Sequence, residues 1–191
     1  MAITIRPATP ADVGQILAFI HALAVYEREP DAVKATEADL LEHGFGENPY
    51  YSCLIAELDG VPAGFALYFY NYSTWLGRPG LYLEDLFVLT EHRGAGIGKA
   101  LLQRLAQIAG EKGCGRMCWE VLDWNRPAID FYQAMGAVIL KEWLNVRLTG
   151  DALRRLATCD GACGSYAQVP ATCGGAGGAN AQGPKPVGGT E

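Results

Sequence analysis

The chain has 191 residues, of which 50% are hydrophobic and 19% are charged, and its formal net charge at pH 7 is −6. This length suits one well-packed domain and excludes two large ones. The acidic balance argues against a nucleic-acid partner, because nucleic-acid binders normally present a basic face.

Membrane insertion and disulfide bonding are also not expected. No apolar run approaches the roughly 18–20 residues that span a bilayer, and residues 1–7 lack the apolar core of a signal peptide. We therefore expect a soluble, cytoplasmic protein without a membrane partner. Cys53, Cys114 and Cys118 lie in apolar runs, where reduced thiols behave as small hydrophobic groups. Three further cysteines, near the C-terminus, match no standard zinc spacing, so we expect no metal site.

The first half of the chain predicts strands and helices in alternation. An acidic residue lies three positions after Thr9 and three positions after Thr36, which is the pattern of a helix N-cap. Asp59-Gly60 is a strong hairpin signal between two apolar runs. The predicted elements are a strand over 3–6, a helix from Thr9 to about Tyr26, a short helix after Thr36, and strands over 51–58 and 61–72.

The second half continues this mixture. Its predicted elements are a strand from residue 81, a helix over 96–112, a strand over 117–122, a helix over 127–135, strand segments over 137–148 and a final helical turn over 151–157. An antiparallel hairpin among alternating strands and helices indicates an α/β fold of the α+β type. We expect a mixed, mainly antiparallel sheet with helices on both faces.

The end of the chain has a different composition. Residues 158–191 are rich in glycine and almost free of large apolar side chains. Such a segment cannot bury enough surface to offset its conformational entropy. We therefore expect one domain over residues 1–157 and a disordered tail over 158–191.

A glycine-rich turn lies between the predicted strand at residue 81 and the helix that follows. Gly94, Gly96 and Gly98 alternate there, at a predicted helix N-terminus where free N–H groups attract anions. The third glycine comes one position too early for a dinucleotide-binding turn, and Lys99 is followed by Ala100 rather than the Ser or Thr of a P-loop. The remaining interpretations are another pyrophosphate site or a simple tight turn.

Two motifs together resemble the GNAT N-acetyltransferase superfamily. The first is Arg-x-x-Gly-x-Gly, from Arg93 to Gly98. The second is Asn-x-x-Ala-x-x-Phe-Tyr-x-x-x-Gly-Ala, from Asn125 to Ala137. Within the superfamily, residues 23–27, 39–46 and 81–88 are most similar to the diamine (spermidine/spermine) N-acetyltransferases. The resemblance extends from Ile3 to about Ala157 and omits the tail.

The resemblance implies a site for acetyl-coenzyme A. Backbone groups of residues 86–88 would align the pantetheine arm as an added strand does, and the glycine turn would hold the pyrophosphate. The full set of cofactor-binding residues that it implies is Leu86, Phe87, Val88, Arg93, Gly94, Ala95, Gly96, Ile97, Gly98, Lys99, Asn125, Arg126, Pro127 and Tyr132.

The same resemblance implies the catalytic and acceptor residues. Tyr132 would protonate the leaving thiolate, although its apolar surroundings also suit a core aromatic residue. Glu84 would bind the amine or act as the general base, and its position in an apolar strand favours a functional role, because a buried carboxylate is costly. The implied amine-binding residues are Tyr26, Glu27, Glu84 and Asp85.

The expected function is acetyl transfer to a primary amine of a small diamine or polyamine, by direct transfer in a ternary complex. Alternatives are another amine (a thialysine-like amino acid, an aminoglycoside or a protein amine) or a non-catalytic module that binds acyl-coenzyme A. The resemblance also implies a homodimer.

Overall fold

The computed structural model describes residues 1–158. The described residues fall into two units, divided between Ala137 and Val138. Apart from Thr158, the predicted tail over 158–191 lies outside the described residues, as do Cys159, Cys163 and Cys173. Within the described range, none of the helices combines the length and apolar character needed to cross a bilayer.

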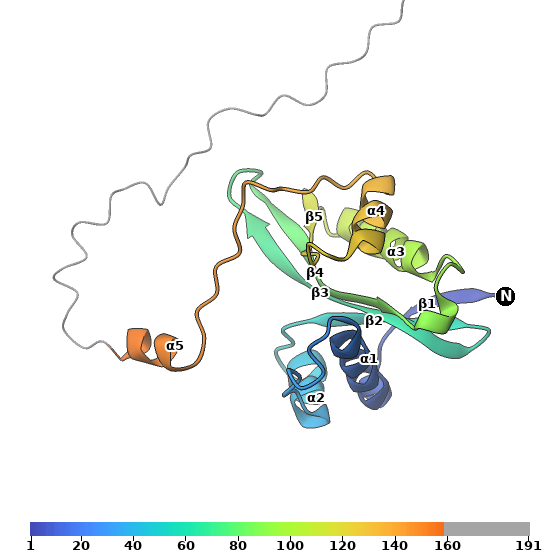
Figure 1. Ribbon diagram of the computed structural model, residues 1–191, viewed down its shortest axis with the longest axis horizontal. Coiled ribbons are helices and arrows are strands. Elements are labelled where there is room, and N and C mark those ends of the chain that lie inside the picture. The colour runs from blue at the N-terminus through green and yellow to red at the C-terminus, as the bar shows by residue number, and fades with distance from the viewer. Residues whose placement is uncertain (159–191) are drawn as a thin grey trace, which may run out of the picture. The chain divides into compact units, whose positions relative to one another are not determined.

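The first unit is built on one five-stranded sheet (Figure 1). Its strands lie in sequence order, and each of the first four is antiparallel to its neighbour, whereas the last pair is parallel. The predicted mixed, mainly antiparallel sheet is therefore confirmed. The strands are β1 (Ile3–Pro7), β2 (Ser52–Leu58), β3 (Val61–Ser73), β4 (Arg78–Val88) and β5 (Arg116–Cys118).

Helices cover both faces of this sheet, as Figure 1 shows. On one face lie α1 (Val13–Tyr26) and α2 (Glu37–Phe45), and on the other lie α3 (Ile97–Glu111) and α4 (Arg126–Ala134). Two short 3-10 helices, Pro10–Asp12 and Thr90–His92, precede α1 and α3. Each face has its own apolar core. The fully buried Phe19 and Phe65 are central to the first core, and Leu101 and Leu105 to the second.

Local sequence signals account for several element boundaries. Thr36 and Asp39 form the predicted capping box at the start of α2. Asp59 and Gly60 both have positive φ, 51° and 83°, which suits the tight hairpin turn between β2 and β3.

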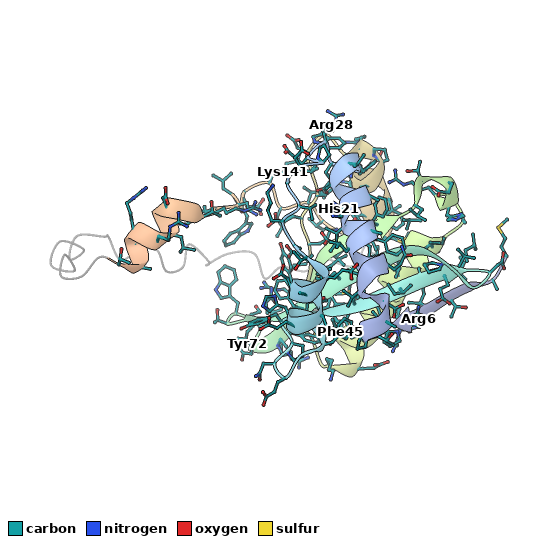
Figure 2. The ribbon with its side chains drawn as sticks, turned by 90° about the horizontal axis from the view of Figure 1, so that it is seen from below. Arg6, His21, Arg28, Phe45, Tyr72 and Lys141 are labelled. Atoms are coloured by element: carbon teal, nitrogen blue, oxygen red, sulfur yellow. The ribbon has the colours of Figure 1, made fainter. Side chains whose placement is uncertain are left out.

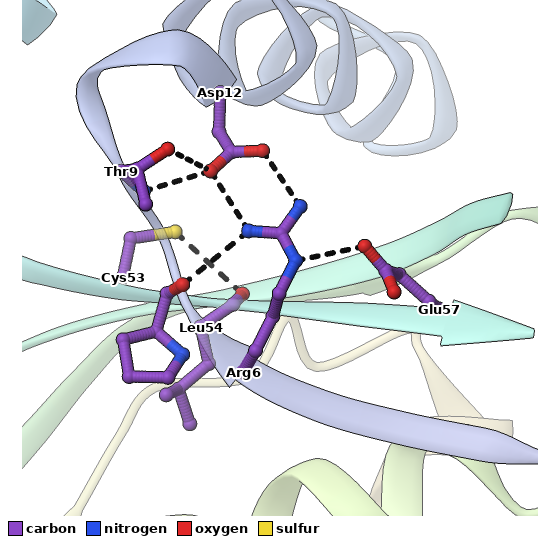
Figure 3. A network of polar contacts seen from close by, with 7 residues as sticks. Arg6, Thr9, Asp12, Cys53, Leu54 and Glu57 are labelled. Atoms are coloured by element: carbon purple, nitrogen blue, oxygen red, sulfur yellow. Dashed lines mark hydrogen bonds and ion pairs between the residues drawn. The ribbon is translucent and has the colours of Figure 1, made fainter. Parts of the chain in front are cut away.

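A network of ionic hydrogen bonds joins β1 to its neighbours (Figure 3). The Arg6 guanidinium donates to both carboxylate oxygens of Asp12 at 2.8 Å and to Oε1 of Glu57 at 2.8 Å. Hydrogen bonds from Arg6 and then from Thr9 hold the pKa of Asp12 well below its usual range, and they outweigh the opposing effect of burial. The network therefore connects the first strand, the start of α1 and the second strand.

The structure differs from the sequence prediction near the end of the sheet. The predicted strand over 117–122 is present only as far as Cys118, because β5 pairs with β4 at Gly80, Leu81 and Tyr82 alone within the described residues. The strand segments expected over 137–148 are absent from the described chain. An apolar run becomes a strand only where a neighbouring strand is available for pairing.

The second unit contains α5 (Gly150–Ala157). The segment that precedes this helix exposes many of its large apolar side chains, including Val138, Trp143, Leu144 and Val146.

Candidate active site

A cavity of about 590 Å³ opens where β4 and β5 separate. Beyond Tyr82, β4 continues to Val88 without a pairing partner on the β5 side in the described structure. Residues 84–88 line one side of the cavity, and residues 120–122 line the other. A strand with free backbone groups can hydrogen-bond an extended ligand in the way that it would bond another strand.

A β-bulge at Glu84 determines which side chains enter this cavity. Leu67 pairs with Asp85 and Tyr68 pairs with Leu83, so Glu84 has no partner on β3. A single extra residue exchanges the two faces of the strand that follows it. Leu83 accordingly packs in the α3 core, and Phe87 packs in the α1 core.

The bulge corrects one step of the sequence argument. Glu84 is exposed, so the cost of burying a carboxylate does not apply to it. Asp85 is the partly buried carboxylate, and its register places it on the face of α1. Burial, followed by repulsion from Glu84 and Glu27, raises the pKa of Asp85 to about 6.

Four carboxylates line the same cavity, and Glu120 is one of them. Glu27, at the C-terminal end of α1, lines it together with Glu84 and Asp85. Burial also raises the pKa of Glu27. Neighbouring acids with raised pKa values favour a ligand that carries positive charge, because such a ligand relieves their mutual repulsion.

The glycine turn forms another part of the cavity wall. Gly94 and Gly96 have φ of 82° and 90°, values that residues with a Cβ rarely adopt. Gly96 is the N-cap of α3, and no side chain caps this helix end. The first hydrogen bond of the helix runs from the Ala100 N–H to the Gly96 carbonyl, so the preceding N–H groups are available to an anion. A Cβ at Gly94 would meet no atom within 4 Å, so the space beside this residue is open.

Tyr132 lies at the base of the cavity, on α4. Its side chain is 7% exposed and contacts the rings of Trp119 and Phe131, with centroids 5.2 Å and 5.4 Å away. Burial, followed by nearby Tyr26 and Glu27, raises the pKa of Tyr132 to about 12. The phenol is therefore protonated at neutral pH.

Asn125 joins α4 to the end of α1. Its Oδ1 accepts hydrogen bonds from the Ala128 N–H at 3.4 Å and from the Tyr26 hydroxyl at 2.9 Å. Asn125 is therefore the N-cap of α4. The Tyr26 ring also contacts the Trp124 ring, with the two centroids 6.1 Å apart. The guanidinium carbon of Arg28 lies 4.3 Å from the centroid of the Trp124 ring. Figure 2 shows Arg28 just beyond the C-terminal end of α1.

Arg93 contacts residues of α1 and β4 that line the cavity. Its guanidinium carbon lies 4.3 Å from the centroid of the Tyr26 ring and 5.7 Å from that of Phe87. Its Nε donates a hydrogen bond of 3.2 Å to the Val88 carbonyl.

The structure brings most of the predicted site residues into one cavity. Of the predicted set, only Ala95 and Arg126 are not among the lining residues, and the exposed Arg126 pairs with Asp130 at 3.0 Å. The sequence prediction missed several lining residues. They are Leu23, His92, Glu120, Val121, Leu122, Ala128, Phe131 and Met135.

Two kinds of signal could have found some of these residues. The first signal is position in the sequence. His92 directly precedes the motif that begins at Arg93, although the spacing of the histidines did not suggest a ligand site. Ala128, Phe131 and Met135 share a face of α4 with Tyr132, because residues three or four positions apart lie on one side of a helix.

Comparison with known proteins decides the family. The profile of the Acetyltransferase (GNAT) family matches residues 14–137, which form most of the first unit. The chain belongs to this GNAT family. It is an N-acetyltransferase that uses an acyl-coenzyme A donor, as the sequence resemblance implied.

Individual GNAT relatives are similar over nearly all of the described chain. The thialysine N-epsilon-acetyltransferase of Bos taurus is 44% identical over 166 residues, which cover 81% of this chain and 97% of the relative. The spermidine/spermine N(1)-acetyltransferase-like protein 1 of Homo sapiens is 42% identical over 163 residues, covering 80% of this chain but 23% of that longer protein. Among solved structures, an integron cassette protein of V. cholerae has a TM-score of 0.70 and 29% identity, covering 83% of this chain and 99% of that one.

Proposed function

We propose that this GNAT enzyme transfers an acetyl group from acetyl-coenzyme A to a primary amine of a small polycationic acceptor, a diamine or polyamine. The observation that carries the proposal is one cavity lined both by four carboxylates and by a glycine-rich helix N-terminus that no side chain caps in the described structure. The first feature suits a cation and the second suits a pyrophosphate. Both substrates would then bind together, and the acetyl group would pass directly between them.

The proposed donor site uses mainly backbone groups. Leu86, Phe87 and Val88 would hydrogen-bond the pantetheine arm, because this part of β4 has no partner on its β5 side among residues 1–158. The pyrophosphate would lie against the turn from Arg93 to Lys99. The remaining proposed contacts come from α4 and its N-cap, at Asn125, Arg126, Pro127 and Tyr132.

The proposed acceptor site uses side chains. Glu27, Glu84 and Asp85 would bind the ammonium groups, and the Tyr26 ring would contact the carbon chain between them. Asp85 suits a proton acceptor, because a pKa of about 6 leaves it mostly ionised at pH 7 yet more basic than an ordinary carboxylate. Glu84, which is exposed, would bind the amine or accept its proton through water.

The reaction forms one bond and breaks another. The neutral amine nitrogen bonds to the acetyl carbonyl carbon, and the bond between that carbon and the coenzyme A sulfur breaks. The proton released by the nitrogen goes to a carboxylate, and the thiolate takes a proton from the Tyr132 hydroxyl. Burial weakens Tyr132 as an acid, but it also makes a thiolate formed beside it more basic, so transfer between them remains feasible.

A second candidate acceptor is a thialysine-like amino acid. The observation in its favour is the 44% identity to the bovine protein named for that activity. The four carboxylates around the cavity count against it, since an amino acid carries a carboxylate of its own. An aminoglycoside or a protein amine has less support from this chain, and so does a module that only binds acyl-coenzyme A.

A thiol-release assay with the full chain and acetyl-coenzyme A tests the proposal. The acceptors are putrescine, spermidine, thialysine and an aminoglycoside. We expect the highest kcat/KM with a diamine or polyamine. A preference for thialysine would replace the proposed acceptor by the second candidate. Tight cofactor binding without turnover of any amine would refute the enzyme proposal.

Substitution of the proposed acid provides a separate test. Tyr132→Phe should lower kcat by about 100-fold or more, the usual contribution of a general acid, while the Kd of coenzyme A changes little. The exposed Tyr72→Phe is the matched control and should leave kcat unchanged. Equal kcat for Tyr132→Phe and the unmodified enzyme would remove Tyr132 from the proposed chemistry.

We also propose that the enzyme is a homodimer. The support is the number of large apolar side chains exposed on residues 138–148, since soluble monomers rarely expose so many together. Light scattering of the purified chain would measure its mass, and a monomer at micromolar concentration would refute this proposal. The cytoplasmic location and the lack of a nucleic-acid or membrane partner stay predictions from the sequence.

A further inference from the structure

Arg93 lies at the junction of the two proposed substrate sites. It is the C-cap of the 3-10 helix Thr90–His92, and it directly precedes Gly94, the first glycine of the turn. Its side chain points to the acceptor side, where it stacks on Tyr26, and its Nε bonds the Val88 carbonyl. Arg93 is thus adjacent in sequence to the proposed pyrophosphate site but contacts other parts of the cavity.

Both of these contacts involve groups that the proposed reaction would use. The Val88 carbonyl belongs to the part of β4 that would pair with pantetheine. The guanidinium on the Tyr26 ring places a positive charge in the cavity that Glu27, Glu84 and Asp85 also line. A cationic amine that enters this cavity is repelled by that charge.

A pyrophosphate in the glycine turn offers the Arg93 guanidinium a stronger partner. Arg93 is exposed, and a cation–π contact at an exposed position is weak. Hydrogen bonds from a guanidinium to phosphate oxygens join opposite charges and are often bidentate, which makes them stronger than bonds to a neutral carbonyl. Phosphate oxygens in the adjacent turn would therefore compete with the Val88 carbonyl and the Tyr26 ring for the guanidinium.

We propose that Arg93 is an electrostatic latch that couples the two substrate sites. Acetyl-coenzyme A draws the guanidinium away from Tyr26 and Val88, which frees the carbonyl for pantetheine and removes a positive charge from the acceptor site. The amine then binds more tightly to the enzyme that already holds its donor. By thermodynamic linkage, the amine strengthens donor binding by the same factor. This inference rests on the proposed function and adds a binding order to it.

Calorimetric titration of the full chain with spermidine tests the latch. Coenzyme A without an acetyl group takes the donor's place, so that no turnover occurs. We expect saturating coenzyme A to lower the Kd of spermidine by about fivefold or more, which is a typical coupling between sites. Arg93→Met should bind spermidine more tightly than the unmodified chain when coenzyme A is absent, and its two Kd values should differ by less than about twofold.

Further variants separate the latch from a general loss of charge or structure. Arg78→Gln removes an exposed arginine at the start of β4, outside the site, and should retain the full coupling. Tyr26→Phe retains the ring under Arg93 and should retain the coupling, whereas Tyr26→Leu should lose most of it. If Arg93→Met does not fold, the comparison of Tyr26→Phe with Tyr26→Leu still tests whether the contact between Arg93 and Tyr26 couples the two sites.

The outcomes distinguish the latch from the proposed function. Equal spermidine Kd values with and without coenzyme A, in an enzyme that turns over polyamines, would overturn the latch alone. The latch would also be overturned if coenzyme A lowered the Kd of spermidine as much in Arg93→Met as in the unmodified chain. An enzyme that binds neither coenzyme A nor spermidine would overturn the latch together with the proposed function.

Discussion

The Tyr26 hydroxyl donates a hydrogen bond of 2.9 Å to Oδ1 of Asn125, and these residues are 99 positions apart in the chain. Tyr26 ends α1 on one face of the sheet, and Asn125 begins α4 on the other. The hydrogen bond therefore closes the wall of the cavity between the two helical layers. It also connects a proposed acceptor residue to the cap of the helix that carries Tyr132.

Asn125→Ala should destabilise the protein by about 1–2 kcal/mol, because it removes the cap of α4 and the partner of the Tyr26 hydroxyl. Tyr26→Phe removes only the hydrogen bond between the helices and should cost less. Urea unfolding of both variants gives the two free energies of unfolding. An Asn125→Ala variant as stable as the unmodified protein would show that the cap makes no measurable contribution.

Asp85→Asn should stabilise the protein at pH 7. The pKa of Asp85 is about 6 in the folded chain and 3.8 for an ordinary Asp, so the folded state binds more protons between these values. The favourable contribution of protonated Asp85 to the free energy of unfolding is therefore fully present below pH 4, and it is lost as the pH rises through 6. Replacement by a neutral amide should recover about 2 kcal/mol at pH 7.

The measurement for Asp85 is urea unfolding at several pH values. The gain for Asp85→Asn over the unmodified chain should disappear near pH 4, and the exposed Glu47→Gln should show no such trend. A gain that is independent of pH would assign the effect to packing rather than to ionisation. The same substitution should lower kcat/KM for the amine if Asp85 accepts its proton.

Asp12→Asn should have the opposite pH dependence. Because Arg6 lowers the pKa of Asp12, this carboxylate contributes stability above pH 4, and the contribution is lost as the pH falls further. We expect a loss of about 1–2 kcal/mol at pH 7, allowing for the partial exposure of Arg6. Thermal unfolding at pH 7 and pH 3 measures the difference, with the exposed Asp151→Asn as control. Equal losses at both pH values would contradict the ionic origin.

Gly96→Ala should cost about 1 kcal/mol of stability, because its φ of 90° is unfavourable for alanine. It should also raise the KM for acetyl-coenzyme A, since relaxation of the strain would move the N–H groups that we assign to the pyrophosphate. Gly110, inside the same helix, has ordinary φ and open space around it. Gly110→Ala should therefore stabilise the protein by about 0.5–1 kcal/mol. The prediction fails if Gly96→Ala leaves both stability and KM unchanged.

Local signals in the sequence predicted the elements of the fold, but not every boundary. Capping residues, the Asp59-Gly60 turn and helical spacing of apolar residues act over a few positions, so they can be interpreted without the fold. The bulge at Glu84 depends on pairing with β3, and no local feature of the apolar run from residue 81 indicates it. For this reason the sequence assigned the buried carboxylate to Glu84, whereas the structure assigns it to Asp85.

Pairing also explains the two strand predictions that were wrong. Residues 119–122 and 137–148 have strand-like composition, but a strand needs a hydrogen-bonded neighbour, and the described chain provides none for either run. The separation of β4 and β5 cannot be predicted from apolar patterning, because it is a property of two strands rather than one. The motifs did predict most of the cavity lining, because the family resemblance that they carry implies a whole set of site residues.

The separation of β4 and β5 has a consequence for how acceptor preference can change. A donor held mainly by main-chain amides is insensitive to most side-chain replacements nearby, because every residue except proline supplies the same N–H and C=O groups. The proposed acceptor, in contrast, would meet the side chains of Glu27, Glu84 and Asp85. Substitutions at a few acidic positions can therefore alter which amine is acetylated while the affinity for the donor is retained.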